Sequence, residues 1–429
     1  MKLKFIIISL IFSSLNAFSQ QLEIANWFGN KKSATVFTFD DWSPGQYSFL
    51  STVATNKQLP FSVYVTIANA WQSDAYNKMS TMINAGCEIG NHTSSHPQLT
   101  NSSNLKLEIR DVYNELNRLL PNQKVTTLAY PFGDFNQRVI DSTKILHIAA
   151  RTVDSSLNNW GYNFVKTNND YYKIPTQEVN YFVGTKGMLK AINQGIENGG
   201  LVTLMYHSIY SFSSNVYDFW FDPIHIDTLN KMFDLALEKR TQTWVTTLSN
   251  AVKYHKEKNS ATLNLISSTY ALNTYQLTDT LSDNNMFNHP LTLNYTLGND
   301  ENIDSIVQKQ KLTFTKSNGK ITFNAIPDGG EIKMYKQSKP VGIADKTTLS
   351  TVNIYPNPGK GYAYIQSDAA FDSNVSIKIF DLQGLEITDF EIENVNTNTI
   401  KLKTNIEGLY FLKLSNLQSS EIYKIKFGE

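Results

Sequence analysis

The feature that most constrains the fold is the alternation of short apolar runs with longer helical patterns between residues 33 and 258. Amphipathic segments separate the runs; in NLKLEIRDVYNELNRLL, for example, leucine, isoleucine and valine recur on one helical face. Continuously apolar strands that alternate with helices predict a parallel sheet covered by helices, either open or closed into a barrel. The seven predicted strands are ATVFTF, FSVYVTI, CEIGN, TTLAY, IAARTV, LVTLMYH and TWVTT.

After residue 260 the pattern changes to the alternation of half-buried strands. TLNLISSTYAL, PLTLNYTLG, KLTFTKSNGKITFNAIP and EIKMYK, with a turn at SNGK, predict a small antiparallel β-sandwich over residues 261–345. Its composition fits either carbohydrate binding or a spacer role. A polar linker then leads to a second all-β sandwich domain over residues 351–429.

The beginning of the chain has the pattern of a secretory signal. Lys2 and Lys4 precede a short apolar stretch, and Ala17 and Ser19 have the −3/−1 spacing of a cleavage site. We therefore predict a signal peptide over residues 1–19 and no transmembrane span, because the apolar stretch is too short to cross a bilayer. The 38 basic and 38 acidic residues balance, which argues against nucleic acid as a partner.

Polar residues follow several of the predicted strands directly. The carboxyl ends of parallel strands meet at one rim, where active sites of such sheets lie. Two imidazoles and a carboxylate are typical zinc ligands, although an HxxxH spacing alone is a weak signal. The sequence therefore predicts an active site formed by residues after the first, third, fourth, fifth and sixth strands: Asp40, Asp41, His92, His96, Tyr130, Asp154 and His207.

These motifs resemble those of the polysaccharide deacetylases with a NodB-homology domain, the fourth carbohydrate-esterase family. TFDD, His92-Thr-Ser-Ser-His96, AYPFG, VDSSLNNW and MYH occur in the family's order over about residues 33–258. The resemblance implies a distorted (β/α)7 barrel for a catalytic domain over residues 20–260. It also implies a metal-dependent hydrolase that removes acetyl groups from a polysaccharide or oligosaccharide, from either an N-acetyl amide or an O-acetyl ester.

The resemblance also implies a role for each residue that matches a motif. Asp41, His92 and His96 would bind a divalent metal, Zn²⁺ foremost, with Co²⁺ or another divalent ion as the alternative. Asp40 would be the general base for the attacking water, and His207 the general acid for the leaving group. Asp154 would tune His207, and the backbone N–H of Phe132 would stabilise the oxyanion. The expected pocket residues are Tyr130, Pro131, Phe132, Trp160 and Met205.

One departure from the family pattern concerns the third motif, which usually begins with an arginine that orients the base. Ala129 stands at that position, and Arg151 could supply the guanidinium from another direction. An ordinary ion pair between Asp154 and Arg151 is the alternative interpretation. The absent arginine is also the only support for a rival class, a secreted carbohydrate-binding protein on an inactive deacetylase fold. A purely structural surface protein would leave the ordered motifs unexplained.

The last part of the chain resembles the C-terminal sorting domain of the type IX secretion system. IYPNP, IFDLQG and GLYFLKL carry the resemblance across residues 351–429. It implies export through the periplasm with the type IX machinery as partner, to a secreted or cell-surface location. We therefore expect an exported monomer whose other partner is an acetylated polysaccharide.

Overall fold

The computed structural model describes residues 22–153, 170–180, 183–298, 301–337, 352–371, 375–415 and 420–428. It divides into two compact units, Met1–Gln337 and Ser338–Glu429. The predicted signal peptide lies outside the described residues, as do Asp154 and Trp160. Among the helices that the structure describes, none has both the length and the apolar character needed to cross a membrane.

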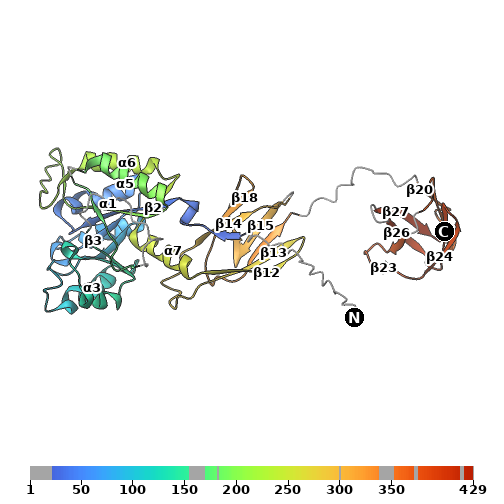
Figure 1. Cartoon of the computed structure of the whole chain (residues 1–429), viewed down its shortest axis with the longest axis horizontal. Helices are drawn as coiled ribbons and strands as arrows, with labels where there is room; N and C mark the ends of the chain where they lie inside the picture. Colours follow the sequence, from blue (N-terminus) through green and yellow to red (C-terminus); the bar gives the residue numbers. More distant parts are fainter. Residues whose placement is uncertain are drawn as a thin grey trace, which may run out of the picture. The chain divides into compact units, whose positions relative to one another are not determined.

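A parallel sheet with helices around it forms the centre of the first unit (Figure 1). Its strand order is β6-β5-β4-β3-β2-β8-β7, and β11 pairs with the first half of β2. All seven predicted strands are present, and the short β7 was not predicted. The parallel sheet with its surrounding helices confirms the predicted distorted (β/α) fold. The strands are β2 (Ser33–Asp40), β3 (Ser62–Val65), β4 (Glu88–Asn91), β5 (Thr127–Ala129), β6 (Ala149–Arg151), β7 (Gln177–Glu178), β8 (Leu201–Tyr206) and β11 (Thr243–Thr246).

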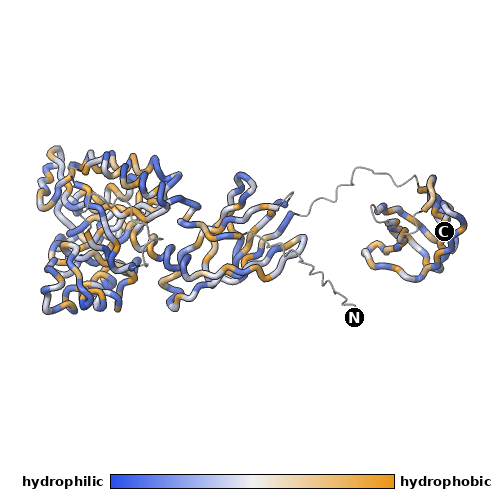
Figure 2. Tube along the Cα trace, in the orientation of Figure 1, coloured by the Kyte–Doolittle hydropathy of each residue, from blue (hydrophilic) through white to orange (hydrophobic). Residues whose placement is uncertain are grey.

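Helices cover this sheet, and short runs of apolar and hydrophilic residues alternate along them (Figure 2). The buried cluster beneath them is rich in aromatic rings; Phe39 packs on Phe61 and Tyr206 with centroid distances of 5.3 Å. All eight residues of β2 are buried, as expected for a central strand of a covered parallel sheet. The helices are α1 (Pro44–Lys57), α2 (Ala75–Asn84), α3 (Val112–Leu119), α4 (Gln137–Lys144), α5 (Gly184–Asn198), α6 (Ile226–Glu238) and α7 (Leu248–Ser260), with short helical turns η1 (Phe28–Asn30), η2 (Ile67–Asn69), η3 (Lys106–Asp111, a π-helix) and η4 (Pro131–Gly133).

Two antiparallel sheets follow α7 in the same unit, with the orders β1-β14-β18-β17 and β12-β13-β19-β15-β16. The predicted SNGK turn joins β17 to β18, where Asn318 and Gly319 both adopt positive φ between the paired residues Ser317 and Lys320. One buried cluster includes Tyr254 of α7 and Leu293 of β14. The strands are β1 (Leu22–Ile24), β12 (Thr262–Ser268), β13 (Leu272–Thr278), β14 (Leu291–Thr296), β15 (Ile303–Gln308), β16 (Gln310–Leu312), β17 (Phe314–Ser317), β18 (Lys320–Ala325) and β19 (Ile332–Lys336).

The second unit is all-β, as predicted. Its two four-stranded antiparallel sheets have the orders β20-β21-β25-β24 and β23-β22-β26-β27. GLYFLKL lies in β26, where Leu412 and Leu414, two residues apart, are buried in the core. The strands are β20 (Val352–Tyr355), β21 (Tyr362–Ser367), β22 (Ser376–Phe380), β23 (Glu386–Ile387), β24 (Phe390–Asn396), β25 (Thr399–Thr404), β26 (Gly408–Ser415) and β27 (Ser420–Phe427).

Candidate active site

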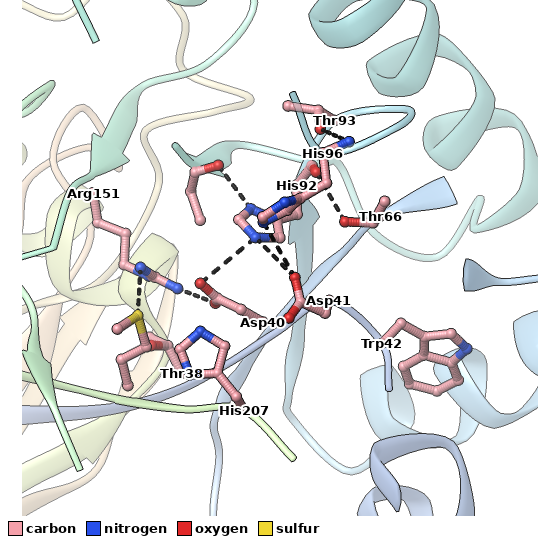
Figure 3. A network of polar contacts seen from close by, with 12 residues as sticks. Thr38, Asp40, Asp41, Trp42, Thr66, His92, Thr93, His96, Arg151 and His207 are labelled. Atoms are coloured by element: carbon pink, nitrogen blue, oxygen red, sulfur yellow. Dashed lines mark hydrogen bonds and ion pairs between the residues drawn. The ribbon is translucent and has the colours of Figure 1, made fainter. Parts of the chain in front are cut away.

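The two neighbouring aspartates meet at one site because the chain turns sharply after β2. Side chains of successive residues in a strand point to opposite faces. Here Asp41 and Trp42 both adopt left-handed backbone conformations, with φ of 83° and 60°. Each such non-glycine residue costs about 1–3 kcal/mol and persists where the surrounding structure enforces it. The turn brings Asp41 beside Asp40, whereas Trp42 points away from the cluster and is buried (Figure 3).

A buried glutamine fixes this turn. The Gln46 amide nitrogen donates to the carbonyl oxygen of Asp40 and, at 2.8 Å, to that of His207, while its oxygen accepts from the Trp42 N–H at 3.1 Å. Gln46 therefore ties the end of β2 to the end of β8. No sequence motif indicates this role, because Gln46 is recognised only by the two strands that its amide joins.

The two histidines follow β4 in a loop that is held at several points. The ring of His92 is buried, and its Nδ1 donates to the Ala129 carbonyl oxygen at 2.9 Å. Because a carbonyl can only accept, Nε2 of His92 is left to face the aspartates. His96 has a left-handed backbone (φ 58°), and its N–H donates to the Thr93 hydroxyl oxygen at 3.0 Å. Glu108 of the π-helix η3 accepts from the backbone N–H groups of the two serines between the histidines.

Asp41, His92 and His96 form a cluster with the composition of a metal site. One ligand atom from each lies within 4.8 Å of the others. Oδ1 of Asp41 lies 3.3 Å from Nε2 of His92 and 3.4 Å from Nε2 of His96. Bonds of about 2.0–2.1 Å in a tetrahedral zinc site separate neighbouring ligand atoms by about 3.3–3.4 Å. Two imidazole nitrogens and a carboxylate at these separations fit a divalent cation.

The charges of this cluster are mutually dependent. Burial opposes ionisation of Asp41, but the hydrogen bond from His92 and the charges of the surrounding imidazoles outweigh it and lower the Asp41 pKa to about 2. The pKa of His96 is lowered, mainly because burial opposes its protonated form. Burial opposes protonation of His92, but the Asp40 and Asp41 carboxylates outweigh it and raise the His92 pKa. A divalent ion requires an ionised carboxylate and neutral imidazoles, so its binding would release the proton of His92.

Arg151 reaches Asp40 from the far side of the curled sheet. Its Nη2 forms a short ion pair with Oδ1 of Asp40, and both side chains are buried (Figure 3). Nη1 contacts the Met205 sulfur at 3.3 Å, and the guanidinium lies 4.8 Å from the centre of the Tyr64 ring. Ala129, where the family pattern has arginine, is the register partner of Arg151 on the neighbouring strand. The guanidinium that contacts Asp40 therefore comes from β6, whereas the family pattern places it on β5.

His207 follows β8 and lies on the opposite side of Asp40 from the two other histidines. Burial is the main cause that lowers the pKa of His207. Its Nδ1 lies 3.6 Å from Oε1 of Glu178, a residue that the sequence analysis missed. Asp154, expected beside His207, lies outside the described residues. Glu178 ends the two-residue strand β7, and a single acidic residue there was the only signal that could have identified it.

These side chains surround one cavity of about 380 Å³. Among the predicted pocket residues, Tyr130, Phe132 and Met205 line it, whereas Pro131 is buried and is not among the lining residues that the structure describes. Phe132 is 64% exposed, and its ring centre lies 4.6 Å from that of His96. Phe221 was not predicted, and its ring centre lies 4.7 Å from that of His207. The cavity therefore has polar groups in its floor and aromatic rings beside two of its histidines.

Glu178 gives the stability of the first unit a specific dependence on pH. Burial, followed by the adjacent Asp222 carboxyl, raises the Glu178 pKa to about 8. Between the ordinary glutamate pKa and about 8, the unfolded chain ionises this group while the folded protein does not, so its contribution to stability falls as pH rises. Replacing Glu178 by glutamine should therefore increase the free energy of unfolding most at pH 8. Denaturant unfolding at pH 5 and pH 8 would measure this; a stability difference between wild type and variant that does not change with pH contradicts it.

Comparisons with known proteins address the two ends of the chain. Residues 29–150 match the family model "Polysaccharide deacetylase", and residues 353–426 match "Secretion system C-terminal sorting domain". A gellan lyase from Bacillus sp is 24% identical over 366 residues, which are 76% of this chain but 14% of that protein. This chain therefore spans a small part of that relative.

Several solved structures are also similar to part of the chain. A family 4 carbohydrate esterase from Bacillus anthracis is 20% identical, with 52% of this chain and 83% of that one covered and a TM-score of 0.35. A peptidoglycan deacetylase from Bacillus subtilis is 16% identical, with coverages of 54% and 95% and a TM-score of 0.36. A polysaccharide deacetylase from Bacillus cereus is 18% identical, with coverages of 33% and 45% and a TM-score of 0.28.

The parallel (β/α) sheet with carboxylates and histidines at the carboxyl ends of its strands defines the class of protein, a NodB-like fold with a candidate metal site. Together with the family models, this identifies the chain as one that carries a polysaccharide deacetylase domain and a C-terminal secretion sorting domain. Both predicted family resemblances are confirmed. The sorting domain indicates a secreted or cell-surface protein.

Proposed function

We propose that this protein hydrolyses acetyl groups from a polysaccharide or oligosaccharide, with Asp40 as base and His207 as acid. The observation that carries the proposal is the convergence of Asp40, Asp41, His92, His96 and His207 on one cavity, from strands that are far apart in sequence. A carbohydrate-binding protein without activity would not need a buried counter-ion on Asp40 or a histidine on each side of it.

The chain's own groups can account for each proton transfer. Asp40, held by Arg151, accepts a proton from the water that adds to the acetyl carbon. The backbone N–H of Phe132 would donate to the carbonyl oxygen as it gains charge. His207 then donates a proton to the sugar nitrogen or oxygen while its bond to the acetyl carbon breaks. The products are acetate and a free amino or hydroxyl group.

Asp41, His92 and His96 would hold the divalent metal, for which Zn²⁺ fits the ligand types best and Co²⁺ is an alternative. When bound, such an ion lowers the pKa of a coordinated water and thus supplies a nucleophile near neutral pH. Asp40 lies beside this set but is held by Arg151, and its Oδ2 is 3.7 Å from Nε2 of His92. This division of the aspartate pair supports a ligand role for Asp41 and a base role for Asp40.

Export would proceed through the periplasm, with the type IX machinery recognising the sorting domain. The acetylated glycan would then be met outside the cell. The sandwich that follows α7 would hold the catalytic domain in place, since one of its sheets includes β1 and its core includes residues of α7.

Acetate release and its dependence on metal test the proposed function. The exported protein should release acetate from at least one of three substrates, chitohexaose, peptidoglycan fragments or acetylated xylan, and the responsive substrate distinguishes amide from ester. Chelation should reduce the rate by at least about 10²-fold, as expected for loss of the nucleophile's activation, and added Zn²⁺ should restore it. His96→Gln should weaken the metal affinity. Full activity after complete metal removal would contradict the mechanism.

A further inference from the structure

The loop that carries the two candidate ligands His92 and His96 is held by side chains rather than by regular secondary structure. We call residues 92–96 the histidine loop. Thr93 and His96 both adopt left-handed backbone conformations, with φ of 71° and 58°. Non-glycine residues are uncommon in this region and persist where surrounding contacts enforce it. The contacts of this loop therefore decide whether its two imidazoles face the same cation.

Every backbone N–H group of the histidine loop has an acceptor. The first, that of His92, donates to the Val65 carbonyl oxygen at 3.1 Å and continues the pairing of the sheet. The other four donate to side-chain oxygens: that of Thr93 to Asn91, those of Ser94 and Ser95 to Glu108, and that of His96 to Thr93. Among these side chains, only Glu108 comes from a distant part of the chain.

Glu108 is a buried carboxylate whose side-chain hydrogen bonds all go to the histidine loop. It is 5% exposed. Its Oε2 accepts from the N–H groups of Ser94 and Ser95 at 2.9 and 3.0 Å, and its Oε1 accepts from the Ser95 hydroxyl at 2.8 Å. Within the described part of the chain, no lysine or arginine pairs with it. Because a buried carboxylate without partners is strongly unfavourable, these three donors are what stabilise Glu108 at this position.

The helix that carries Glu108 departs from α-helical geometry at this point. Lys106–Asp111 is the π-helix η3, although the sequence predicts an α-helix there. Such helices are rare and often occur at functional sites. The next residue, Ile109, uses its carbonyl oxygen to accept from Nδ2 of Asn91 at 2.9 Å. The π-helix therefore contacts both the histidine loop and the residue that precedes it.

The carbonyl groups of the histidine loop are bound by a different segment, which follows β3. The Thr66 hydroxyl donates to the His92 carbonyl oxygen at 3.1 Å (Figure 3). Two N–H groups of η2 donate to the carbonyl oxygens of the next two residues of the loop, at 3.1 and 3.0 Å. These contacts do not replace Glu108, because they bind carbonyl groups only. Without its carboxylate, two N–H groups in the middle of the loop would lose their acceptor.

We propose that Glu108 is a positioning residue, which holds the histidine loop in its ligand-presenting conformation before metal is bound and thereby sets the affinity of the candidate metal site. Its hydrogen bonds reach neither histidine, so it acts through the two serines between them. The inference rests on the proposed function and deepens it by identifying what prepares the metal site. A loop that is already ordered need not become ordered when the ion binds, which strengthens binding.

Attraction of the cation by the charge of Glu108 is the alternative explanation, and glutamine distinguishes the two. A glutamine at this position has the same shape, and its carbonyl oxygen can accept from both N–H groups. Its NH₂ group can donate to the Ser95 hydroxyl, which is able to donate or to accept. Glu108→Gln therefore removes the charge but keeps the hydrogen bonds, whereas Glu108→Ala removes both.

The test uses the full chain, freed of metal by dialysis against a chelator, and two measurements that need no substrate. Zn²⁺ affinity is measured by competition with a chromophoric chelator, and hydrogen exchange of the metal-free protein is measured by mass spectrometry. Glu108→Ala should weaken Zn²⁺ affinity by about 10–100-fold and speed exchange in residues 93–96, while β8 stays protected. Glu108→Gln should remain within about fivefold of wild-type affinity. Glu115→Ala is the matched control, because it removes a glutamate of α3 whose side chain is 41% exposed, and it should change neither measurement.

Ser95→Ala removes one of the three hydrogen bonds and serves if Glu108→Ala does not fold. It should weaken Zn²⁺ affinity by about three- to tenfold. Zn²⁺ affinity within about twofold of wild type in Glu108→Ala, or in Ser95→Ala where that variant takes its place, would overturn the proposal. Equal weakening by Glu108→Ala and Glu108→Gln would also overturn it and assign the effect to charge.

The same measurements separate this proposal from the proposed function. Wild-type protein that binds neither Zn²⁺ nor Co²⁺ would overturn both this inference and the metal site on which it rests. Wild-type protein that binds metal, with Glu108→Ala binding it equally well, would overturn this inference alone. Because neither measurement uses a glycan, weaker Zn²⁺ binding by Glu108→Ala supports the inference even if no acetate is released.

Discussion

Replacing Arg151 by alanine is expected to lower kcat for acetate release by about 10²-fold or more and to destabilise the first unit by about 3–5 kcal/mol. Both partners of the ion pair with Asp40 are buried, so the alanine variant leaves a carboxylate without its counter-ion in a low-dielectric site. A buried, uncompensated carboxylate favours its protonated form, which cannot accept a proton from water. Acetate-release kinetics and urea unfolding measure the two effects separately.

The register of the sheet offers a rescue experiment for this prediction. Ala129 and Arg151 are partners on β5 and β6, and Arg151→Ala vacates space beside Ala129. Adding Ala129→Arg to Arg151→Ala should therefore recover part of both kcat and stability, because it returns a guanidinium to the same level of the sheet. Arg118→Ala, which removes an exposed arginine, is the control and should change neither quantity. An Arg151→Ala enzyme with at least one third of the wild-type kcat would contradict a positioning role for this arginine.

The neighbouring aspartates should give opposite results when each is replaced by asparagine. Asp40→Asn is expected to retain the bound metal but to lower kcat by about 10²–10⁴-fold, the range for loss of a general base. Asp41→Asn is expected to lose affinity for metal as well, because Oδ1 of Asp41 lies 3.3–3.4 Å from both histidine nitrogens. Metal content by elemental analysis and kcat on the same preparations would measure the difference.

One control is needed, because Asp40→Asn also leaves Arg151 buried without its counter-ion. The variant's stability should be measured first, and kinetics should be recorded at a temperature at which near-UV circular dichroism shows it to be folded. Loss of metal in both variants would mean that the pair acts as one ligand set. A folded Asp40→Asn enzyme within tenfold of wild type would remove Asp40 from the role of base.

Most of the fold could be predicted because it depends on local periodicity. The seven apolar strands needed only continuous burial, and the SNGK turn needed only two residues that tolerate positive φ. The predicted helix of NLKLEIRDVYNELNRLL begins as a π-helix, Lys106–Asp111. This difference has a physical reason, since Glu108 is directed toward the loop between the two histidines. Residues 154–169 and their fourth motif stay a prediction.

The site was predictable where a motif carried it and unpredictable where contacts cross the sheet. The convergence of Asp40, Asp41, His92, His96 and His207 on one cavity could be predicted from their positions at the ends of strands, and their chemical roles stay predictions. The contact of Arg151 with Asp40 depends on how far the sheet curls, which no sequence pattern shows. Glu178, Gln46 and Glu108 are single polar residues without a motif, and their roles arise only from the elements that they join. These three residues could be recognised only from interatomic distances in the structure, because no spacing along the sequence marks them.

The pairing of β1 with β14 sets an order for the maturation of the protein. Leu22 is the register partner of Tyr295, so the first strand after the predicted leader remains without its neighbour until most of the chain has been synthesised. Trp27 likewise donates to the carbonyl oxygen of Gly199 at 2.9 Å, which fastens the start of the chain to a later part of the barrel. A fragment that ends after α7 would expose an open strand edge and the apolar residues behind it. The sandwich is therefore completed by a strand made before the parallel sheet, and a stable fragment must extend through residue 337.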